Sequence, residues 1–226
     1  MNCQLRIARN NERVAKADGW NAMAHITSVA QLRERLPERR GPTKLKIRDH
    51  LDEQSVAFIA RAPFLLLSTV DADGLVEVSP KGDEPGFVHV ADRNTILIPD
   101  RAGNNLAFGH INVLANPHVG LIFLMPGSGE TLRVSGHAAL YDDADLCERF
   151  AARGKPAKLV TKVVVTRAYF HCARSILRAN LWQPDKWAEP MKVSFGKLFA
   201  EILNADAAII PKIDANVQAE YTPENL

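Results

Sequence analysis

Residues 63–170 constrain the fold most, because short apolar segments alternate there with turn residues. Residues 64–70 and 75–79 are separated by Asp-Ala-Asp-Gly, and this arrangement predicts a β-hairpin. Five further segments have the length and composition of strands: residues 86–90, 95–98, 119–125, 131–141 and 160–170. We therefore expect an antiparallel, mainly β fold.

Two of these strands differ in their side-chain pattern. Residues 119–125 are apolar on both faces, which predicts a central place in the sheet. Residues 131–141 alternate instead, and Thr131 and Arg133 point to the same face. That face either meets solvent or contacts an anion, and the pattern leaves both readings open.

Helices are expected around these strands. Thr27 or Ser28 can cap a first helix that ends before Pro37, and a second is expected from Asp49 to Pro63. Residues 105–115, 142–152 and 195–203 have helical patterns too. We predict a loosely ordered arm over residues 1–25 and a single domain over residues 26–226, with N-terminal helices and a C-terminal extension.

Composition excludes several classes of function. The chain has 28 Lys and Arg against 26 Asp and Glu, too even a balance to indicate a nucleic-acid or membrane surface. Three cysteines without a Cys-x-x-Cys pair favour a reducing compartment, so a cytoplasmic location is expected. The seven histidines have no metal-ligand spacing, and no metal is predicted.

The segment from Pro99 to Asn105 lies between a predicted strand and a predicted helix. A helix N-terminus offers unpaired amides and partial positive charge, and Arg101 can add a bidentate contact, so the segment suits a phosphate group. Asp100, Asn104 and Asn105 are equally ordinary as helix caps without a ligand.

A second segment, Val78-Ser79-Pro80-Lys81, ends a strand, and its proline predicts an edge position. Exposed edge amides and the Lys81 charge could bind the polar rim of a flat heterocycle. A strand end with a solvated lysine is the alternative.

A third cluster follows the last strand. Arg174, Arg178 and Trp182 are spaced one helical turn apart. They could cover a ring and a phosphate, or they could form a dimer contact.

Taken in order, these segments resemble the pyridoxamine 5'-phosphate oxidase-like flavin-binding superfamily, specifically a bacterial subfamily of FMN-dependent enzymes of unassigned substrate. The matching segments are Pro63-Phe64, Val78-Ser79-Pro80-Lys81-Gly82-Asp83, Pro85-Gly86-Phe87-Val88, Ile98-Pro99-Asp100-Arg101 with Gly103-Asn104-Asn105, Asn116-Pro117, Glu130-Thr131-Leu132-Arg133-Val134 and His171-Cys172-Ala173. The resemblance implies a split β-barrel, of the α+β class, that forms a homodimer with two FMN sites at the subunit interface.

The resemblance also implies roles for individual residues. Val78 to Lys81 match the strand along the isoalloxazine ring, and Ile98 to Arg101 with Asn104 and Asn105 match the segment that holds the ribityl chain and phosphate. Thr131 and Arg133 match a strand position that touches the flavin. The implied residues that close the site from the partner subunit are Arg174, Arg178 and Trp182.

Two departures from the family affect the expected activity. The subfamily commonly has lysine where this chain has Arg174, and the C-terminal substrate motif of the vitamin B6 oxidases is absent, so pyridoxamine phosphate is not the expected substrate. The resemblance implies an FMN-dependent oxidoreductase of a small molecule, with a nicotinamide cofactor as a candidate electron donor. A non-catalytic flavin-binding sensor, carrier or scavenger is the alternative, an empty pocket is a third reading, and relatives that bind a deazaflavin or haem keep those cofactors open.

Overall fold

A computed structural model describes residues 25–38, 41–103 and 105–222. Contacts divide the chain into two units, Met1–Lys44 and Leu45–Leu226. Nearly all of the predicted arm, residues 1–24, lies outside the described residues, so the division into an arm and one domain stays a prediction.

The first unit contains one described helix, α2 (Val29–Arg35), at the position that the sequence predicts. Its N-cap is Ser28, whose Oγ accepts a hydrogen bond from the Gln31 amide at 3.2 Å. None of the α2 residues is buried. A short 3-10 helix, η2 (Pro42–Lys46), follows.

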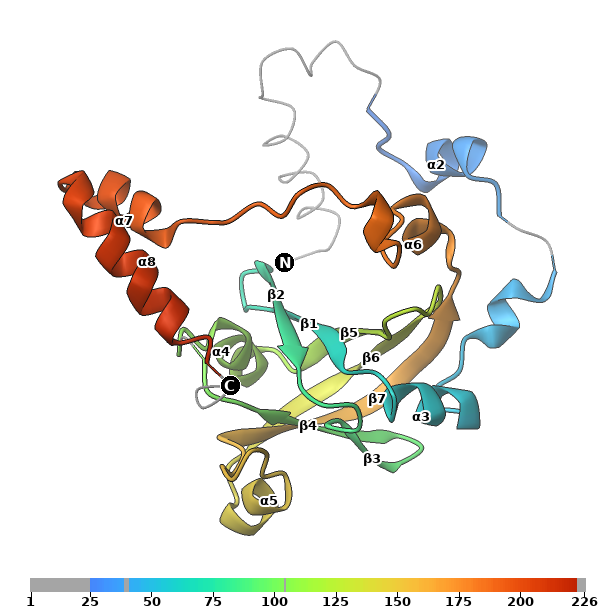
Figure 1. The fold of residues 1–226 in the computed structure, drawn as a ribbon. Helices are drawn as coiled ribbons and strands as arrows, with labels where there is room; N and C mark the ends of the chain where they lie inside the picture. The colour runs from blue at the N-terminus through green and yellow to red at the C-terminus, as the bar shows by residue number, and fades with distance from the viewer. Residues whose placement is uncertain (1–24, 39–40, 104, 223–226) are drawn as a thin grey trace. The chain divides into compact units, whose positions relative to one another are not determined.

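The second unit is built on a seven-stranded antiparallel sheet, whose strands have the order β2-β1-β5-β6-β7-β4-β3 (Figure 1). The strands are β1 (Phe64–Val70), β2 (Val76–Gly82), β3 (His89–Asp92), β4 (Thr95–Asp100), β5 (His118–Leu124), β6 (Thr131–Tyr141) and β7 (Leu159–His171). The predicted hairpin is the β1–β2 pair, and β5 lies inside the sheet as its apolar sequence predicts. The fold is the predicted split β-barrel with flanking helices.

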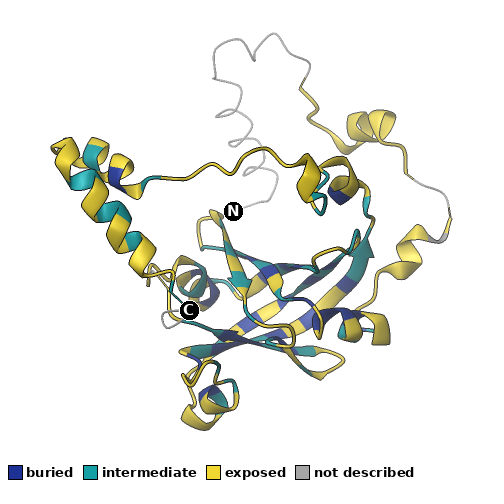
Figure 2. Cartoon of the chain, in the orientation of Figure 1, coloured by how far each residue is buried: buried dark blue, intermediate teal, exposed yellow. Residues whose placement is uncertain are grey.

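The hydrophobic core lies on one face of this sheet. Leu65 and Leu67 of β1, Phe123 of β5 and Leu132 and Val134 of β6 are each at most 2% exposed. Their alternation with more exposed neighbours is visible along the strands (Figure 2). Each such side chain contributes about 1.5–3 kcal/mol of transfer free energy, so these strands supply much of the stability of the sheet.

A bulge bends the sheet where β6 pairs with β7. The register shifts between Ser135 and Gly136, so that β7 has one extra residue there. A Cβ atom at Gly136 would lie 2.2 Å from the carbonyl oxygen of Val164. Only glycine allows the two strands to approach this closely.

The free edges of the sheet are β2 and β3. Pro80 lies on β2 opposite Leu66, which agrees with the edge position predicted from the proline. Because proline lacks an amide hydrogen, it costs no ladder hydrogen bond at an edge position.

Two helices begin later than predicted. α3 (Glu53–Ile59) begins after Asp52, whose Oδ1 accepts from the Ser55 amide at 2.8 Å, and not at Asp49. The preceding Leu51 is not helical because its amide donates a hydrogen bond to the Arg93 carbonyl. α4 (Phe108–Ala115) begins three residues after the predicted start at Asn105, because Asn105 and Ala107 have φ of 57° and 54°.

The remaining helices follow the strands or form the C-terminal part. They are α5 (Ala144–Arg149), α6 (Arg174–Arg178), η3 (Pro184–Lys186), α7 (Phe195–Leu203), η4 (Ala207–Ile209) and α8 (Ile210–Ala219). The bounds of α7 agree with the prediction, whereas α8 lies in the predicted C-terminal extension, where no second helix is expected from the sequence. No helix among the described residues is long and apolar enough to cross a membrane.

α7 and α8 approach each other most tightly at a glycine, Gly196. A Cβ atom at Gly196 would lie 2.4 Å from the Ile210 carbonyl oxygen, and the Gly196 amide donates to Asp214 Oδ1 at 2.8 Å. Ser194 Oγ donates to Asp214 Oδ2 at 2.6 Å. Most other side chains of this helical hairpin are exposed (Figure 2).

Candidate functional site

A hollow of about 650 Å³ lies between β2, the end of β4 and the start of α4. This volume is typical of a small-molecule site. Eight of the predicted site residues line it: Val78, Ser79, Pro80, Lys81, Pro99, Asp100, Arg101 and Asn105. Ile98 lies in the core and is 2% exposed, and Asn104 lies outside the described residues.

The first wall of the hollow is the β2 edge with α4 close against it. A Cβ atom at Gly109 would lie 3.1 Å from Ser79 Oγ, so the glycine allows the helix to approach the strand. Ser79 and Lys81 are half-buried on the same face of β2, while Val78 and Pro80 are exposed. The two segments 78–81 and 99–105, which are far apart in the sequence, therefore meet in one site.

Three ionisable side chains meet at the second wall. Lys81 Nζ forms an ion pair with Asp100 Oδ1, and His110 Nε2 lies 3.6 Å from the same oxygen. Burial lowers the pKa of His110 below its ordinary value, and the Lys81 charge adds to this effect, whereas Asp100 opposes it. His110 is therefore a neutral imidazole at pH 7, and its buried Nε2 has no hydrogen-bond partner among the described residues.

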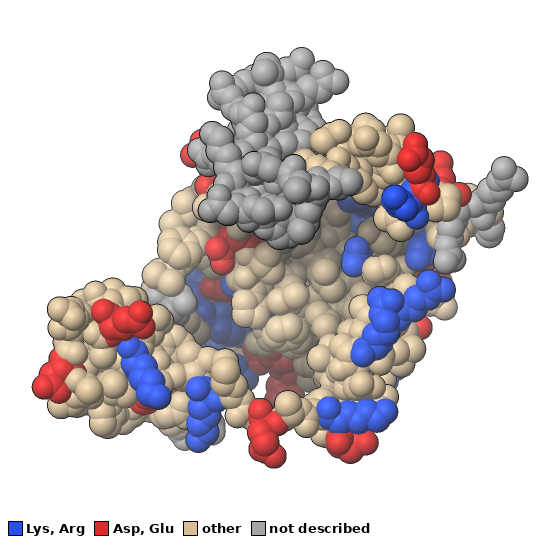
Figure 3. Space-filling view, turned by 90° about the horizontal axis from the view of Figure 1, so that it is seen from above, with Lys and Arg blue, Asp and Glu red and all other residues tan. Residues whose placement is uncertain are grey.

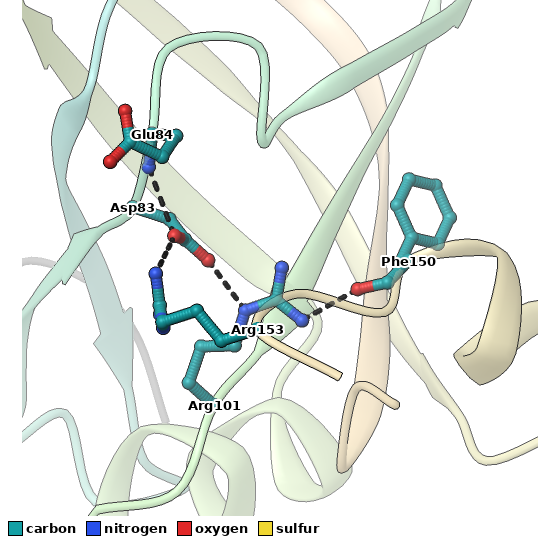
Figure 4. A network of polar contacts seen from close by, with 5 residues as sticks. All are labelled: Asp83, Glu84, Arg101, Phe150 and Arg153. Carbon is teal, nitrogen blue, oxygen red and sulfur yellow. Dashed lines mark hydrogen bonds and ion pairs between the residues drawn. The ribbon is translucent and has the colours of Figure 1, made fainter. Parts of the chain in front are cut away.

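A polar network fixes Arg101 at the rim of the hollow (Figure 4). Arg101 donates from Nε to Asp83 Oδ2 and from Nη1 to the Phe150 carbonyl, both at 2.6 Å. Asp83 Oδ1 accepts from Arg153 Nη1 at 2.8 Å and from the Glu84 amide at 2.9 Å.

The Asp83 carboxylate at the centre of this network is only 2% exposed. Burial by itself would raise the pKa of Asp83, but the hydrogen bonds from Arg101, the Glu84 amide and Arg153 together hold that pKa below its ordinary value. The carboxylate is therefore ionised at pH 7 and balances the charge of one of the two arginines.

The N-terminus of α4 contributes the third wall. Among the described residues no side chain caps this helix, and Ala107 in the N-cap position is left-handed. Uncapped amides and the helix dipole attract anions, which fits the predicted phosphate site although the helix begins at Phe108. Arg101 and Asn105 both lie in the connection from β4 to this helix, and both line the hollow.

The other predicted site residues do not line this hollow. Thr131 and Arg133 lie at the start of β6, and Arg174, Arg178 and Trp182 follow the end of β7. Trp182 Nε1 donates to the Ser128 carbonyl at 2.7 Å. Within this chain the predicted residues therefore form two groups.

The strand registers place the two groups relative to each other along β7 and across the sheet. Asp100 pairs with Leu159 at one end of this strand, and Thr131 pairs with His171 at the other. At about 3.3 Å per residue, the path along β7 between these pairs is about 40 Å. Across the sheet the path is shorter, because Pro80, Leu66, Ile122 and Arg133 are in register on β2, β1, β5 and β6, about 14 Å from first to last.

The second group is basic. Arg133 Nε is buried without a hydrogen-bond partner among the described residues. Burial lowers the pKa of His171, and the charges of Arg133 and Lys46 lower it further. Over the face seen in Figure 3, basic and acidic side chains both occur and neither sign covers it.

Sequence reasoning missed three residues of the site: Asp83, His110 and Arg153. Asp83 ends one of the family-like segments, which was the only signal available. The partners of Asp83 are 18 and 70 residues away in the sequence, and His110 lies within a helix whose start was placed too early.

The family model described as pyridoxamine 5'-phosphate oxidase matches residues 51–172, which is more than half of the chain. A search of curated proteins gave no match.

Several solved structures are similar over about half of the chain. A putative pyridoxamine 5'-phosphate oxidase from Lactobacillus delbrueckii is 22% identical, covers 54% of this chain and 95% of its own, and has a TM-score of 0.43. An FMN-binding protein from Syntrophomonas wolfei is 14% identical, with 52% and 87% covered and a TM-score of 0.39. An F420 reductase is 19% identical, with 54% and 98% covered and a TM-score of 0.38.

Proposed function

Because the chain belongs to the pyridoxamine 5'-phosphate oxidase family, we propose that it binds FMN in the hollow beside β2 and acts as an FMN-dependent oxidoreductase of a small molecule. The observation that carries this proposal is the meeting of an edge strand, a fixed arginine and an uncapped helix N-terminus in one hollow. An edge strand suits the polar rim of a flat ring system, and the other two suit a phosphate ester.

The phosphate would be held by Arg101 and the first amides of α4, with Asn105 beside them. Arg101 keeps N–H donors beyond the two that Asp83 and Phe150 use, since a guanidinium has five. Asn104, which the family pattern also implies, remains part of this proposal. The orphan Nε2 of His110 is a further polar group in the hollow that a ligand could satisfy.

The ring system would lie along Val78 to Lys81. The charge of Lys81 would stabilise negative charge that develops on the ring, and its pairing with Asp100 fixes where that charge lies. When bound, FMN supplies hydride transfer at N5. The neutral His110 lies next to the Asp100 carboxylate and can hold a proton at Nε2. We propose no other proton-transfer group in this hollow.

We also propose that the protein is a homodimer whose partner completes the site. Thr131, Arg133, Arg174, Arg178 and Trp182 do not line the hollow of their own chain, so within one chain they leave the proposed site incomplete. A second copy would bring Thr131, Arg133, Arg174, Arg178 and Trp182 to the hollow.

An exposed apolar surface next to the hollow supports this assembly. Ile111 and Leu114 of α4 are 57% and 78% exposed, and Val76 and Val78 of β2 are 58% and 50% exposed. Clustered apolar side chains of this kind mark interaction surfaces. A second copy of this chain, bound to that surface, would also account for the predicted residues that do not line the hollow of their own chain.

The first experiment is an absorption spectrum of the purified protein, with identification of the released cofactor after denaturation. FMN is expected; a deazaflavin, haem or a colourless protein that does not take up FMN would contradict the proposal. Arg101→Ala should weaken FMN binding at least about tenfold, while Arg149→Ala on α5 should not. Unchanged FMN affinity in Arg101→Ala would refute the phosphate role.

The second experiment separates an enzyme from a binding protein. Loss of the flavin's visible absorption on addition of NADH or NADPH, followed by reoxidation, would support an oxidoreductase with a nicotinamide donor. Bound FMN that neither step changes would favour the alternative, a sensor, carrier or scavenger. The cytoplasmic location expected from the cysteine pattern belongs to the same proposal.

A further inference from the structure

We propose that Asp83 is a positioning residue for the phosphate-binding arginine, and that it thereby gives the site its preference for a phosphate ester over the free alcohol. This inference rests on the proposed FMN site and deepens it. Asp83 itself does not line the hollow, whereas Arg101 does.

Two contacts from different parts of the chain fix the plane of the Arg101 guanidinium. Asp83, in the loop after β2, accepts from Nε, and the Phe150 carbonyl at the end of α5 accepts from Nη1, both at 2.6 Å. A planar group held at two of its nitrogens has a single orientation. The remaining donors of Arg101 then have a fixed direction before any ligand binds, which lowers the entropy lost on binding.

The carboxylate is needed because a second arginine shares it. Arg153 Nη1 donates to Oδ1 at 2.8 Å, while Arg101 uses Oδ2. With both oxygens accepting and the side chain 2% exposed, an amide at this position would have to direct its NH2 group toward one guanidinium. Asp83→Asn would therefore release Arg101 or Arg153 from its fixed position.

The charge change makes the test decisive. Asp83→Asn removes one negative charge near the hollow, so a purely electrostatic role predicts tighter binding of anionic FMN. A positioning role predicts the opposite, because the guanidinium loses its orientation. A general structural role predicts equal losses for FMN and for riboflavin, which lacks the phosphate.

The experiment measures the dissociation constants of FMN and riboflavin for the full-length protein at pH 7. Asp83→Asn should weaken the binding of FMN about tenfold and the binding of riboflavin less than about twofold. Arg153→Ala, which leaves the Asp83–Arg101 pair in place, serves as the matched control and should change FMN affinity less than about threefold. The double variant Asp83→Asn/Arg101→Ala should bind FMN no more weakly than Arg101→Ala, because both changes remove the same contact.

Three results would overturn the inference: unchanged or tighter FMN binding in Asp83→Asn, equal losses for both ligands, or additive losses in the double variant. If Asp83→Asn does not fold, Asp83→Glu takes its place, since it keeps the charge but displaces the carboxylate. Asp83→Glu must weaken FMN binding and leave riboflavin binding unchanged. Any other pattern of affinities rejects the positioning role of Asp83. A wild-type protein that binds neither ligand would instead reject the proposed function.

Discussion

Arg101 Nε lies 2.6 Å from Asp83 Oδ2, although the two residues lie on different connections of the sheet. The pair joins the loop after β2 to the end of β4, and through Phe150 it also joins the end of α5. One ion pair thus connects the stability of the fold with the geometry of the proposed phosphate site.

The first prediction concerns stability against acid. The pKa of Asp83 is lowered in the folded state, so the stabilisation is present above the unfolded pKa of about 3.9 and is lost as pH falls through the folded pKa. Asp83→Asn should destabilise the protein by about 3 kcal/mol at pH 7, because it breaks a buried pair. Urea unfolding should show this difference shrinking steadily below about pH 4; a constant difference would contradict the assignment.

The second prediction concerns the protonation of His110. Because burial lowers its pKa, its NMR titration should lie below the ordinary value of about 6.5. Asp100→Asn should lower that pKa further, since the carboxylate opposes the shift, and Lys81→Met should raise it. A midpoint above 6.5 in the wild-type protein would show that the imidazole is not buried as described.

The third prediction concerns the bulge between β6 and β7. Gly136→Ala should destabilise the fold by about 3 kcal/mol or more, because the new methyl group would overlap the Val164 carbonyl. Gly120→Ala on β5 is the control, since its Cβ atom would lie 4.0 Å from Ser68 Cβ, and it should cost at most about 1 kcal/mol. Equal effects in thermal unfolding would argue against the close approach of the strands.

The fourth prediction concerns the proposed homodimer. Leu114→Asp places a charge on the most exposed apolar position of α4 and should convert the dimer to a monomer in light scattering, with loss of bound FMN. Met191→Asp, at a position that is 85% exposed outside this surface, should change neither property. A wild-type protein that is monomeric yet binds FMN fully would refute the completed two-chain site.

The fifth prediction concerns the C-terminal helical hairpin. Gly196→Ala should separate α7 from α8, because the methyl group would overlap the Ile210 carbonyl. Hydrogen exchange should become faster in both helices and stay unchanged in the sheet, since local opening requires little of the total stability. Lys197→Ala, one residue along, should leave exchange in both helices slow.

The strands could be predicted from the sequence because their patterns are local. β6 has its predicted bounds because apolar and polar residues alternate along its whole length. The start of α4 could not be predicted, since nothing in an alanine signals the left-handed conformation that Ala107 adopts. Asp49 and Asp52 are equally good caps in sequence, and a tertiary contact of Leu51 with Arg93 decides between them.

The candidate site also has residues that local sequence patterns predict and contacts that only the folded chain creates. Lys81, Arg101 and Asn105 could be proposed because each follows a recognisable strand end or precedes a helix, and the structure brings them to one hollow. The contacts of Asp83 with Arg101 and Arg153 depend on how the loops meet after folding, so no local pattern predicts them. Which predicted residues line the hollow depends on the strand registers, and the sequence does not indicate these.

Pro80 on the β2 edge has a consequence for the behaviour of the protein at high concentration. An unpaired strand edge can recruit the same edge of another molecule and extend into fibrous aggregates. Pro80 presents no amide hydrogen to an incoming strand, and Lys81 beside it adds charge. The residues that leave this wall open for a small ligand therefore also discourage uncontrolled polymerisation along the sheet.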